Sequence, residues 1–228
     1  MEYGQFCPIA KALEVLGERW TILIVRELLV GATRFNELQR GLNLISPTIL
    51  TKRLNDLSEA GVIIRKKIPG QRGYEYFLTE MGKELMPVVK SIGDWGMRWA
   101  RGKMDDSDMD IELLMLYLQR SVQPEKLPGR ETVIRFKFDD IKKYSDWWLV
   151  VSDLKVDVCV RDPGKDVDIY FTTGLSTMIH LWMGDISYKS AINDGRLKLV
   201  GPSALTRDIK SWLAPSIFAG IPPANAIQ

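Results

Sequence analysis

The stretch that decides the fold covers residues 33–79, and its sequence is TRFNELQRGLNLISPTILTKRLNDLSEAGVIIRKKIPGQRGYEYFLT. Its first half predicts two helices joined by a turn at residues 41–45. Its second half predicts two strands joined by a loop that contains Pro and Gly. We expect Thr33 to cap the first helix and Ser46, which Pro47 follows, to cap the second helix. A helix-turn-helix followed by a β-hairpin is therefore predicted.

The second helix of this motif has an apolar face and a polar face. Leu50, Leu54 and Leu57 recur at helical spacing and must face a core. Polar side chains that can reach base edges and phosphates in a major groove occupy the other face. With the capping serine, they are Ser46, Thr48, Thr51, Lys52 and Asn55. An ordinary solvated helix face is the alternative explanation of the same pattern.

Cations are concentrated around the predicted hairpin loop. The segment KKIPGQRG at residues 66–73 contains three cations and no acid. A Lys or Arg at such a position can neutralise a backbone phosphate, which adds affinity without sequence information. We expect phosphates to be held by Arg34, Lys66, Lys67 and Arg72. The polar helix face and the basic hairpin together predict a partner that is double-stranded DNA.

Length and charge indicate two domains with different partners. The 228 residues, of which 46% are hydrophobic, suit one large or two ordinary domains. Residues 1–104 carry 16 Lys/Arg against 11 Asp/Glu, whereas residues 105–228 carry 15 against 18. The basic excess therefore coincides with the helix-turn-helix. Because residues 102–110 are acidic and poor in apolar side chains, we predict one domain at 1–103 and another at 111–228, whose first helix Asp110 could cap.

A long helix is predicted after the hairpin, over residues 80–101, with Thr79 as its cap and a kink at Pro87. At 1.5 Å per residue it would span about 33 Å, which is longer than so small a domain can cover. Its apolar stripe includes Ile92, Trp95 and Trp99. We expect these side chains either at a dimer interface with a second copy or beneath the C-terminal domain.

Several short motifs occur in order along the first hundred residues. They are Cys7-Pro8, Gly17-Glu18-Arg19-Trp20, Arg34-Phe35-Asn36-Glu37-Leu38, Leu50-Thr51-Lys52-Arg53-Leu54 and Tyr76-Phe77-Leu78-Thr79. Together they resemble the HxlR-type winged-helix transcriptional regulators. The resemblance implies a homodimeric prokaryotic regulator that places two recognition helices in successive major grooves, about 34 Å apart. Cys7 matches a cysteine that some members use to sense oxidants or electrophiles. The alternative is that Cys7 caps or packs the first helix.

The C-terminal part predicts a sheet covered by helices. Apolar residues alternate with polar ones in four segments, and the apolar sets are Ile134, Phe136 and Phe138; Val156, Val158 and Val160; Val167, Ile169 and Phe171; and Leu197 and Leu199. Such a sheet has one wet face and one covered face. The fold class predicted for the whole chain is α+β, with a winged helix-turn-helix, mostly α with a β-hairpin, followed by an α+β sheet-and-helix layer domain.

Large apolar side chains converge between the predicted helices and the sheet. They are Phe171, Met178, Trp182, Tyr188 and Trp212. Side chains of this kind usually fill a core, although they can also line an apolar pocket. Residues 166–173, 182–187 and 194–201 resemble a sterol-carrier-protein-like domain. That resemblance implies a tunnel for a hydrophobic small-molecule ligand, either acyl or polycyclic.

Sequence patterns that mark enzymes, metal sites and membrane proteins are missing. His180, the single histidine, falls on a polar helix face, where it cannot readily serve a buried triad. Neither Cys/His metal spacing nor a glycine-rich phosphate loop occurs, so we expect no enzyme activity, metal or cofactor. Without a run of 18 apolar residues or a leader pattern, a cytoplasmic location without a membrane partner is expected.

The leading hypothesis is a dimeric DNA-binding transcriptional regulator that a hydrophobic ligand modulates through the C-terminal domain. One alternative is a lipid carrier that uses the winged domain for dimerisation or protein binding. Another is a thiol redox-sensing regulator that acts through Cys7.

Overall fold

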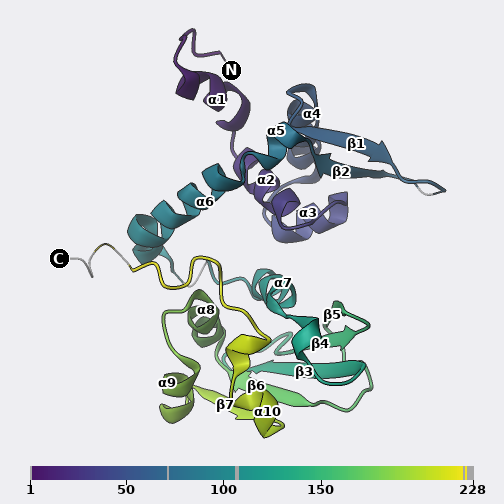
Figure 1. The fold of residues 1–228 in the computed structure, drawn as a ribbon, viewed down its shortest axis with the longest axis vertical. Coiled ribbons are helices and arrows are strands. Elements are labelled where there is room, and N and C mark those ends of the chain that lie inside the picture. The colour runs from purple at the N-terminus through teal and green to yellow at the C-terminus, as the bar shows by residue number, and fades with distance from the viewer. Residues whose placement is uncertain (1, 71, 106–107, 223, 225–228) are drawn as a thin grey trace. The chain divides into compact units, whose positions relative to one another are not determined.

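A computed structural model describes residues 2–70, 72–105, 108–222 and 224, and the chain folds as two units, Met1–Trp95 and Gly96–Gln228 (Figure 1). The first unit is mostly helical with one β-hairpin, and the second combines a sheet with helices. The predicted α+β class is confirmed. The domain boundary predicted between residues 103 and 111 stays a prediction. None of the described helices is long and apolar enough to cross a membrane.

The first unit is a winged helix-turn-helix. Its elements are α1 (Pro8–Leu16), α2 (Thr21–Leu29), α3 (Phe35–Gly41), α4 (Pro47–Glu59), β1 (Ile63–Lys67), β2 (Tyr74–Leu78), α5 (Glu80–Lys83) and α6 (Met86–Trp95). Its core is formed by fully buried side chains from α2, α3 and α4, among them Ile24, Leu38 and Leu50. In Figure 1 the hairpin projects from this helical body. The predicted order of helix, turn, helix and hairpin is confirmed.

The cap predicted for α4 is present, whereas the cap predicted for α3 is wrong. Ser46 Oγ accepts the N–H of Ile49 at 3.3 Å, as expected. At α3 the N-cap residue is Arg34, one position later than predicted. The Glu37 carboxylate accepts the backbone N–H groups of Thr33 and Arg34 at 2.8 and 3.0 Å. Burial alone would raise the pKa of Glu37, but these hydrogen bonds hold the pKa below its ordinary value.

The long helix predicted over residues 80–101 is interrupted. Thr79 Oγ accepts the N–H of Gly82 at 3.2 Å, so the predicted cap is confirmed. However, α5 ends at Lys83 and α6 begins at Met86. Pro87 explains the break, because its ring clashes with the carbonyl four residues earlier and it has no N–H to donate. After α6 the chain continues as a π-helical turn (η1, Gly96–Ala100) and a 3-10 turn (η2, Arg101–Lys103).

The second unit is a five-stranded mixed sheet with helices packed on one face. Its main elements are α7 (Ile111–Ser121), β3 (Glu131–Phe138), β4 (Asp146–Ser152), β5 (Lys155–Cys159), β6 (Ile169–Thr173), α8 (Leu175–Met183), α9 (Tyr188–Asn193), β7 (Leu197–Val200), α10 (Ser203–Thr206) and η5 (Ile209–Ser211). The strand order is β5-β4-β3-β6-β7, and only β3 and β6 pair in parallel. Asp110 caps α7, as predicted, by accepting the N–H of Leu113 at 2.9 Å.

Strand β4 and the second face of the sheet differ from expectation. Alternation does not predict β4, because five consecutive residues of the strand are buried and no polar position interrupts the run. Trp148 and Val150 of β4 pack against Val133 of β3 on the face opposite the main core. The predicted fully wet face is therefore wrong at this point. The main core on the helix-covered face contains Phe136, which stacks on Phe171 with ring centroids 4.7 Å apart.

A buried ion pair lies beneath the end of α3. Glu27 is fully buried and accepts hydrogen bonds from Nε and Nη2 of Arg26 at 2.9 and 2.7 Å. Nη2 of Arg26 also donates to the carbonyl of Gly41 at 3.1 Å. A Cβ atom at Gly41 would lie only 2.1 Å from Oε2 of Glu27. The turn of the helix-turn-helix therefore requires a residue without a side chain at this position.

We predict that Gly41→Ala destabilises the protein by about 1–3 kcal/mol, because the added methyl group overpacks against a carboxylate that its ion pair holds in place. The measurement is the urea unfolding midpoint. Gly96→Ala is the control, since a Cβ atom there meets no atom within 4 Å. Equal midpoints for the two variants would contradict this explanation of Gly41.

Candidate nucleic-acid interface

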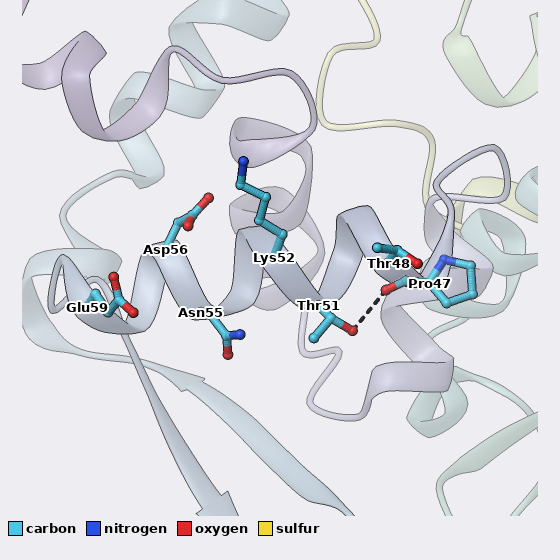
Figure 2. A pocket seen from close by; sticks show the side chains of 7 residues that line it. All are labelled: Pro47, Thr48, Thr51, Lys52, Asn55, Asp56 and Glu59. Carbon is cyan, nitrogen blue, oxygen red and sulfur yellow. Dashed lines mark hydrogen bonds between the residues drawn. The ribbon is translucent and has the colours of Figure 1, made fainter. Parts of the chain in front are cut away.

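The polar face of α4 is exposed and continuous. Thr48, Thr51, Lys52 and Asn55 are all exposed, and together with Pro47, Asp56 and Glu59 they line an open hollow. Figure 2 shows their side chains along the length of the helix, with Lys52 and Asp56 on one edge and Thr51 and Asn55 on the other. The opposite face of α4 is formed by Leu50, Leu54 and Leu57, which are buried in the core. The structure thus brings the predicted α4 residues together on one surface.

The hydrogen-bonding groups of this face differ in what they have left to offer. Thr51 Oγ1 donates its proton to the carbonyl of Pro47 at 2.8 Å, so the hydroxyl can only accept and the methyl group stays free (Figure 2). Lys52 and Asn55 make no side-chain hydrogen bond or ion pair with any residue that the structure describes. Their donors remain available. An amide can bond both N6 and N7 of adenine, and an ammonium can bond O6 and N7 of guanine.

Two acids at the C-terminal end of α4 were not among the predicted site residues. Asp56 and Glu59 follow Lys52 at helical spacings of four and seven residues, a signal that the sequence contains. Asp56 is neutralised by Arg53, whose Nη1 lies 2.8 Å from Oδ2. The Glu59 carboxylate has no partner within the described part of the chain. Negative charge therefore limits how closely phosphates can approach this end of the helix.

Arg53 has a structural position although it adjoins Lys52 in sequence. Its side chain is only 11% exposed. Nη2 donates to the carboxylate of Glu18 at 2.5 Å, and Nε donates to the carbonyl of Arg19 at 3.2 Å. These bonds tie α4 to the turn that precedes α2. The Lys-Arg pair in the sequence thus contains one exposed cation, Lys52, and one cation, Arg53, that holds α4 in place.

The hairpin cations do not all lie where the sequence placed them. Lys66 and Lys67 belong to strand β1, not to the loop, so the predicted loop position is wrong. Lys66 is in register with Glu75, and Lys67 is in register with Tyr74. Because side chains alternate along a strand, the two lysines point to opposite faces of the hairpin. They cannot line one row of phosphates together.

Arg34 and Lys66 flank the same acid. The backbones of Arg34 and Glu75 pair as an isolated antiparallel β-bridge. Nε of the Arg34 side chain lies 3.7 Å from the Glu75 carboxylate. The Tyr76 N–H donates to the carbonyl of Thr33 at 2.8 Å, which holds this segment along β2. Arg72 is exposed in the hairpin loop, next to Gln71, which lies outside the described residues. Arg65, which was not predicted, stacks over the Tyr74 ring at 4.3 Å.

Family comparison covers both units. The sequence model of the HxlR-like helix-turn-helix family matches residues 15–104, and that of the SCP-2 sterol transfer family matches residues 114–214. The uncharacterized HTH-type transcriptional regulator YvaP of Bacillus subtilis is 39% identical over 101 residues, which are 43% of this chain and 94% of YvaP. The chain belongs to the HxlR-like helix-turn-helix family.

Other similar proteins are also named as HTH-type or transcriptional regulators. The HTH-type regulator Mb3122 of Mycobacterium bovis is 40% identical over 89 residues, 39% of this chain and 56% of that protein, so the chain spans about half of Mb3122. Among solved structures, the reduced form of the transcriptional regulator YodB from B. subtilis is 32% identical. The match covers 40% of this chain and 92% of the YodB chain, with a TM-score of 0.36.

Apolar residues predicted for a dimer interface of this HxlR-like chain are exposed. Ile92 and Trp95 of α6 are 49% and 62% exposed. Trp99, in the second unit, is 60% exposed. The redox candidate Cys7 is a partly buried free thiol at the N-cap position of α1, where it makes no side-chain cap hydrogen bond. The alternative that Cys7 packs against the first helix stays a prediction.

The predicted ligand-pocket residues occupy different positions in the second unit. Phe171, Met178 and Trp212 are fully buried in the main core. Trp182 stacks on Tyr117 with ring centroids 4.9 Å apart. Tyr188 is partly buried and lines a separate hollow. Trp182 and Tyr188 also pack against this core, so the five side chains belong to one cluster, and their role as a ligand pocket stays a prediction.

His180 is engaged in charge contacts. Its Nδ1 lies 2.8 Å from Oδ2 of Asp185, a carboxylate that also pairs with Arg101. Burial, and then the charges of Arg101 and Arg196, lower the pKa of His180. No described hydroxyl or thiol is hydrogen-bonded to His180, and no group of His, Cys, Asp and Glu in the described residues could hold a metal ion.

We predict that Arg53→Met lowers the free energy of unfolding by about 0.5–1.5 kcal/mol, because it removes the hydrogen bonds of a mostly buried guanidinium to Glu18, Asp56 and the carbonyl of Arg19. Lys52→Met is the matched control and should change stability by no more than about 0.5 kcal/mol, because Lys52 is exposed. Urea unfolding of both variants tests the assignment. It is refuted if the Lys52 variant loses as much stability as the Arg53 variant.

Proposed function

We propose that this chain is a dimeric DNA-binding transcriptional regulator whose activity a hydrophobic ligand in the C-terminal domain modulates. Residues 1–103 would bind DNA and dimerise, and residues 111–228 would hold the ligand. The observation that carries the proposal is the exposed polar face of α4, with free donors on Lys52 and Asn55. Membership of the HxlR-like family, in which the relatives are named transcriptional regulators, supports regulation rather than catalysis.

The proposed roles of the polar residues follow from their free groups. Asn55 and Lys52 read base edges, and Thr51 contributes its methyl group, which suits a thymine methyl. Ser46 and Thr48, at the start of α4, orient the helix on the flanking backbone. Arg34, Arg72 and one of the two lysines Lys66 and Lys67 supply phosphate affinity. Because Lys66 and Lys67 point to opposite faces of the hairpin, only one of them contacts DNA at each half-site.

A second copy is proposed to cover the exposed apolar side chains of α6. Ile92 and Trp95 are large, exposed apolar side chains of one helix, which is the kind of surface that marks a protein interaction site, and Trp99 belongs to the same predicted interface. A dimer places two copies of α4 on one DNA duplex. Each copy then reads one half-site, and the half-sites lie about 34 Å apart.

A lipid carrier is the second candidate, and the match to the SCP-2 sterol transfer family at residues 114–214 favours it. In that case the winged domain would serve dimerisation or protein binding. Retention on duplex DNA separates the two candidates, because a carrier of this kind has no reason to bind DNA in a salt-dependent way.

We predict that Asn55→Ala weakens binding to a selected site by about 1–3 kcal/mol, with little effect on random duplex, because it removes base contacts. Genomic fragments retained by the full chain would provide the site, and fluorescence anisotropy would measure the affinity. Of Lys66→Ala and Lys67→Ala, one alone should reduce the magnitude of the slope of log K against log salt, by about 0.9 for each half-site and so about 1.8 for the dimer.

The control for these variants is Lys83→Ala, which removes an exposed cation of α5 that pairs with Glu80. It should leave affinity and salt slope unchanged. Equal losses for Lys66→Ala and Lys67→Ala would contradict the proposed orientation of the hairpin. If the wild-type chain retains no fragment above background, the regulator proposal is wrong.

We predict that Trp95→Glu converts the dimer to a monomer, because a carboxylate cannot be buried unpaired in an apolar interface. Light scattering coupled to size exclusion should report half the wild-type mass. Val200→Glu, at an apolar residue of β7 that is 50% exposed, is the control and should keep the wild-type mass. A wild-type protein that is monomeric at all concentrations would rule out the proposed interface.

A further inference from the structure

The second unit contains a hollow that none of the predicted functions uses. It lies between α9 and the segment formed by α10 and η5, and its volume is about 410 Å³. This size falls within the range of small-molecule sites in proteins. Of the residues predicted to line a ligand pocket, only Tyr188 borders this hollow.

Positive charge dominates the rim of the hollow. Lys189, Arg207 and Lys210 line it, against the single acid Asp208. All three cations are exposed, and none forms an ion pair with a residue that the structure describes. Residues 105–228 as a whole carry more acids than bases, 18 against 15. Three unpaired cations around one concave surface of an acidic unit create a local attraction for anions.

Tyr188 adds a hydrogen-bond donor without a partner. Its phenol is largely buried, and burial raises the pKa of Tyr188, so the hydroxyl keeps its proton. No hydrogen bond joins this hydroxyl to any other residue in the described part of the chain. Because Tyr188 lines the hollow, its hydroxyl stays accessible to solvent and to a ligand there. An oxygen of a bound anion could accept this proton in place of water.

The remaining surface of the hollow is partly apolar. Ile192 is exposed beside Lys189, and Ile209 is buried beneath the rim. Contact with these side chains would shield a hydrocarbon segment from water. A ligand that satisfies the whole hollow therefore has a charged oxygen group at one end and an apolar body at the other.

We propose that this hollow binds an amphipathic anion. The carboxylate or phosphate head lies among Arg207, Lys210 and the Tyr188 hydroxyl, and the apolar body lies against Ile192 and Ile209. The inference rests on the proposed ligand-responsive function. It narrows the ligand to an anion and so excludes a neutral polycyclic molecule. It also moves the ligand site away from Phe171, Met178 and Trp212, which are packed within the core.

The test is calorimetric titration of the full chain with four probes: laurate, dodecyl phosphate, 1-dodecanol and inorganic phosphate. We expect laurate and dodecyl phosphate to bind at least about tenfold more tightly than the alcohol of equal chain length, because the alcohol has no charge for the rim to attract. Inorganic phosphate should also bind at least about tenfold more weakly than dodecyl phosphate, because it lacks the apolar body.

Variants assign the binding to this hollow. Arg207→Gln combined with Lys210→Gln should weaken the binding of both amphipathic anions by about tenfold or more. Lys142→Gln combined with Lys143→Gln removes two exposed cations elsewhere in the same unit and should leave the affinity unchanged. Tyr188→Phe, which removes only the hydroxyl, should weaken binding even if the double variant fails to fold.

Three results would overturn the inference. The first is dodecanol binding as tightly as laurate. The second is inorganic phosphate binding as tightly as dodecyl phosphate. The third is unchanged anion affinity in both the Arg207/Lys210 double variant and the Tyr188→Phe variant. DNA retention, measured on the same samples, distinguishes this inference from the proposed function. Anion binding without DNA binding would preserve this site and refute the regulator proposal. DNA binding without anion binding would refute only this site.

Discussion

Burial of three leucines determines the orientation of the candidate interface. Leu50, Leu54 and Leu57 are fully buried at helical spacing, and each contributes roughly 1.5–3 kcal/mol of burial free energy. Rotating α4 about its axis would expose them, and no solvated polar side chain could offset that cost. The position of Asn55 on the opposite side of the helix is therefore a consequence of core packing, and the polar face needs no other support to point outward.

Neighbouring contacts refine this orientation without supplying it. Arg53 ties α4 to Glu18, which prevents the helix from sliding along its leucine stripe. The buried Glu27 beneath Gly41 keeps α3 close to α2, so the turn before α4 keeps its path. The hairpin would contribute positive charge that does not discriminate between DNA sequences, because phosphate contacts position a protein on DNA and base contacts select the sequence. In the proposed complex with DNA, specificity would therefore depend on α4, and affinity would depend on both α4 and the hairpin.

Local patterns were sufficient for the helix-turn-helix, and insufficient where two chain segments decide the outcome. Ser46-Pro47 and the leucine spacing predict α4, because caps and periodicity are properties of neighbouring residues. The opposite orientations of Lys66 and Lys67 depend on cross-strand register, which the loop length alone does not reveal. Strand β4 has no alternation because apolar residues cover both faces. Lys189 and Lys210 line the same basic hollow, and no sequence pattern predicts that these residues lie close together.

Dimethyl sulfate footprinting of a DNA fragment that the full chain retains tests the central claim most directly, because the reagent methylates guanine N7 in the major groove, where the polar face of α4 should lie. The account predicts two protected patches about 34 Å apart along the duplex. Both patches should disappear when Lys52 and Asn55 are replaced together by alanine. A fragment that is bound tightly while every guanine N7 stays reactive, with the α4 double variant bound equally well, would contradict it.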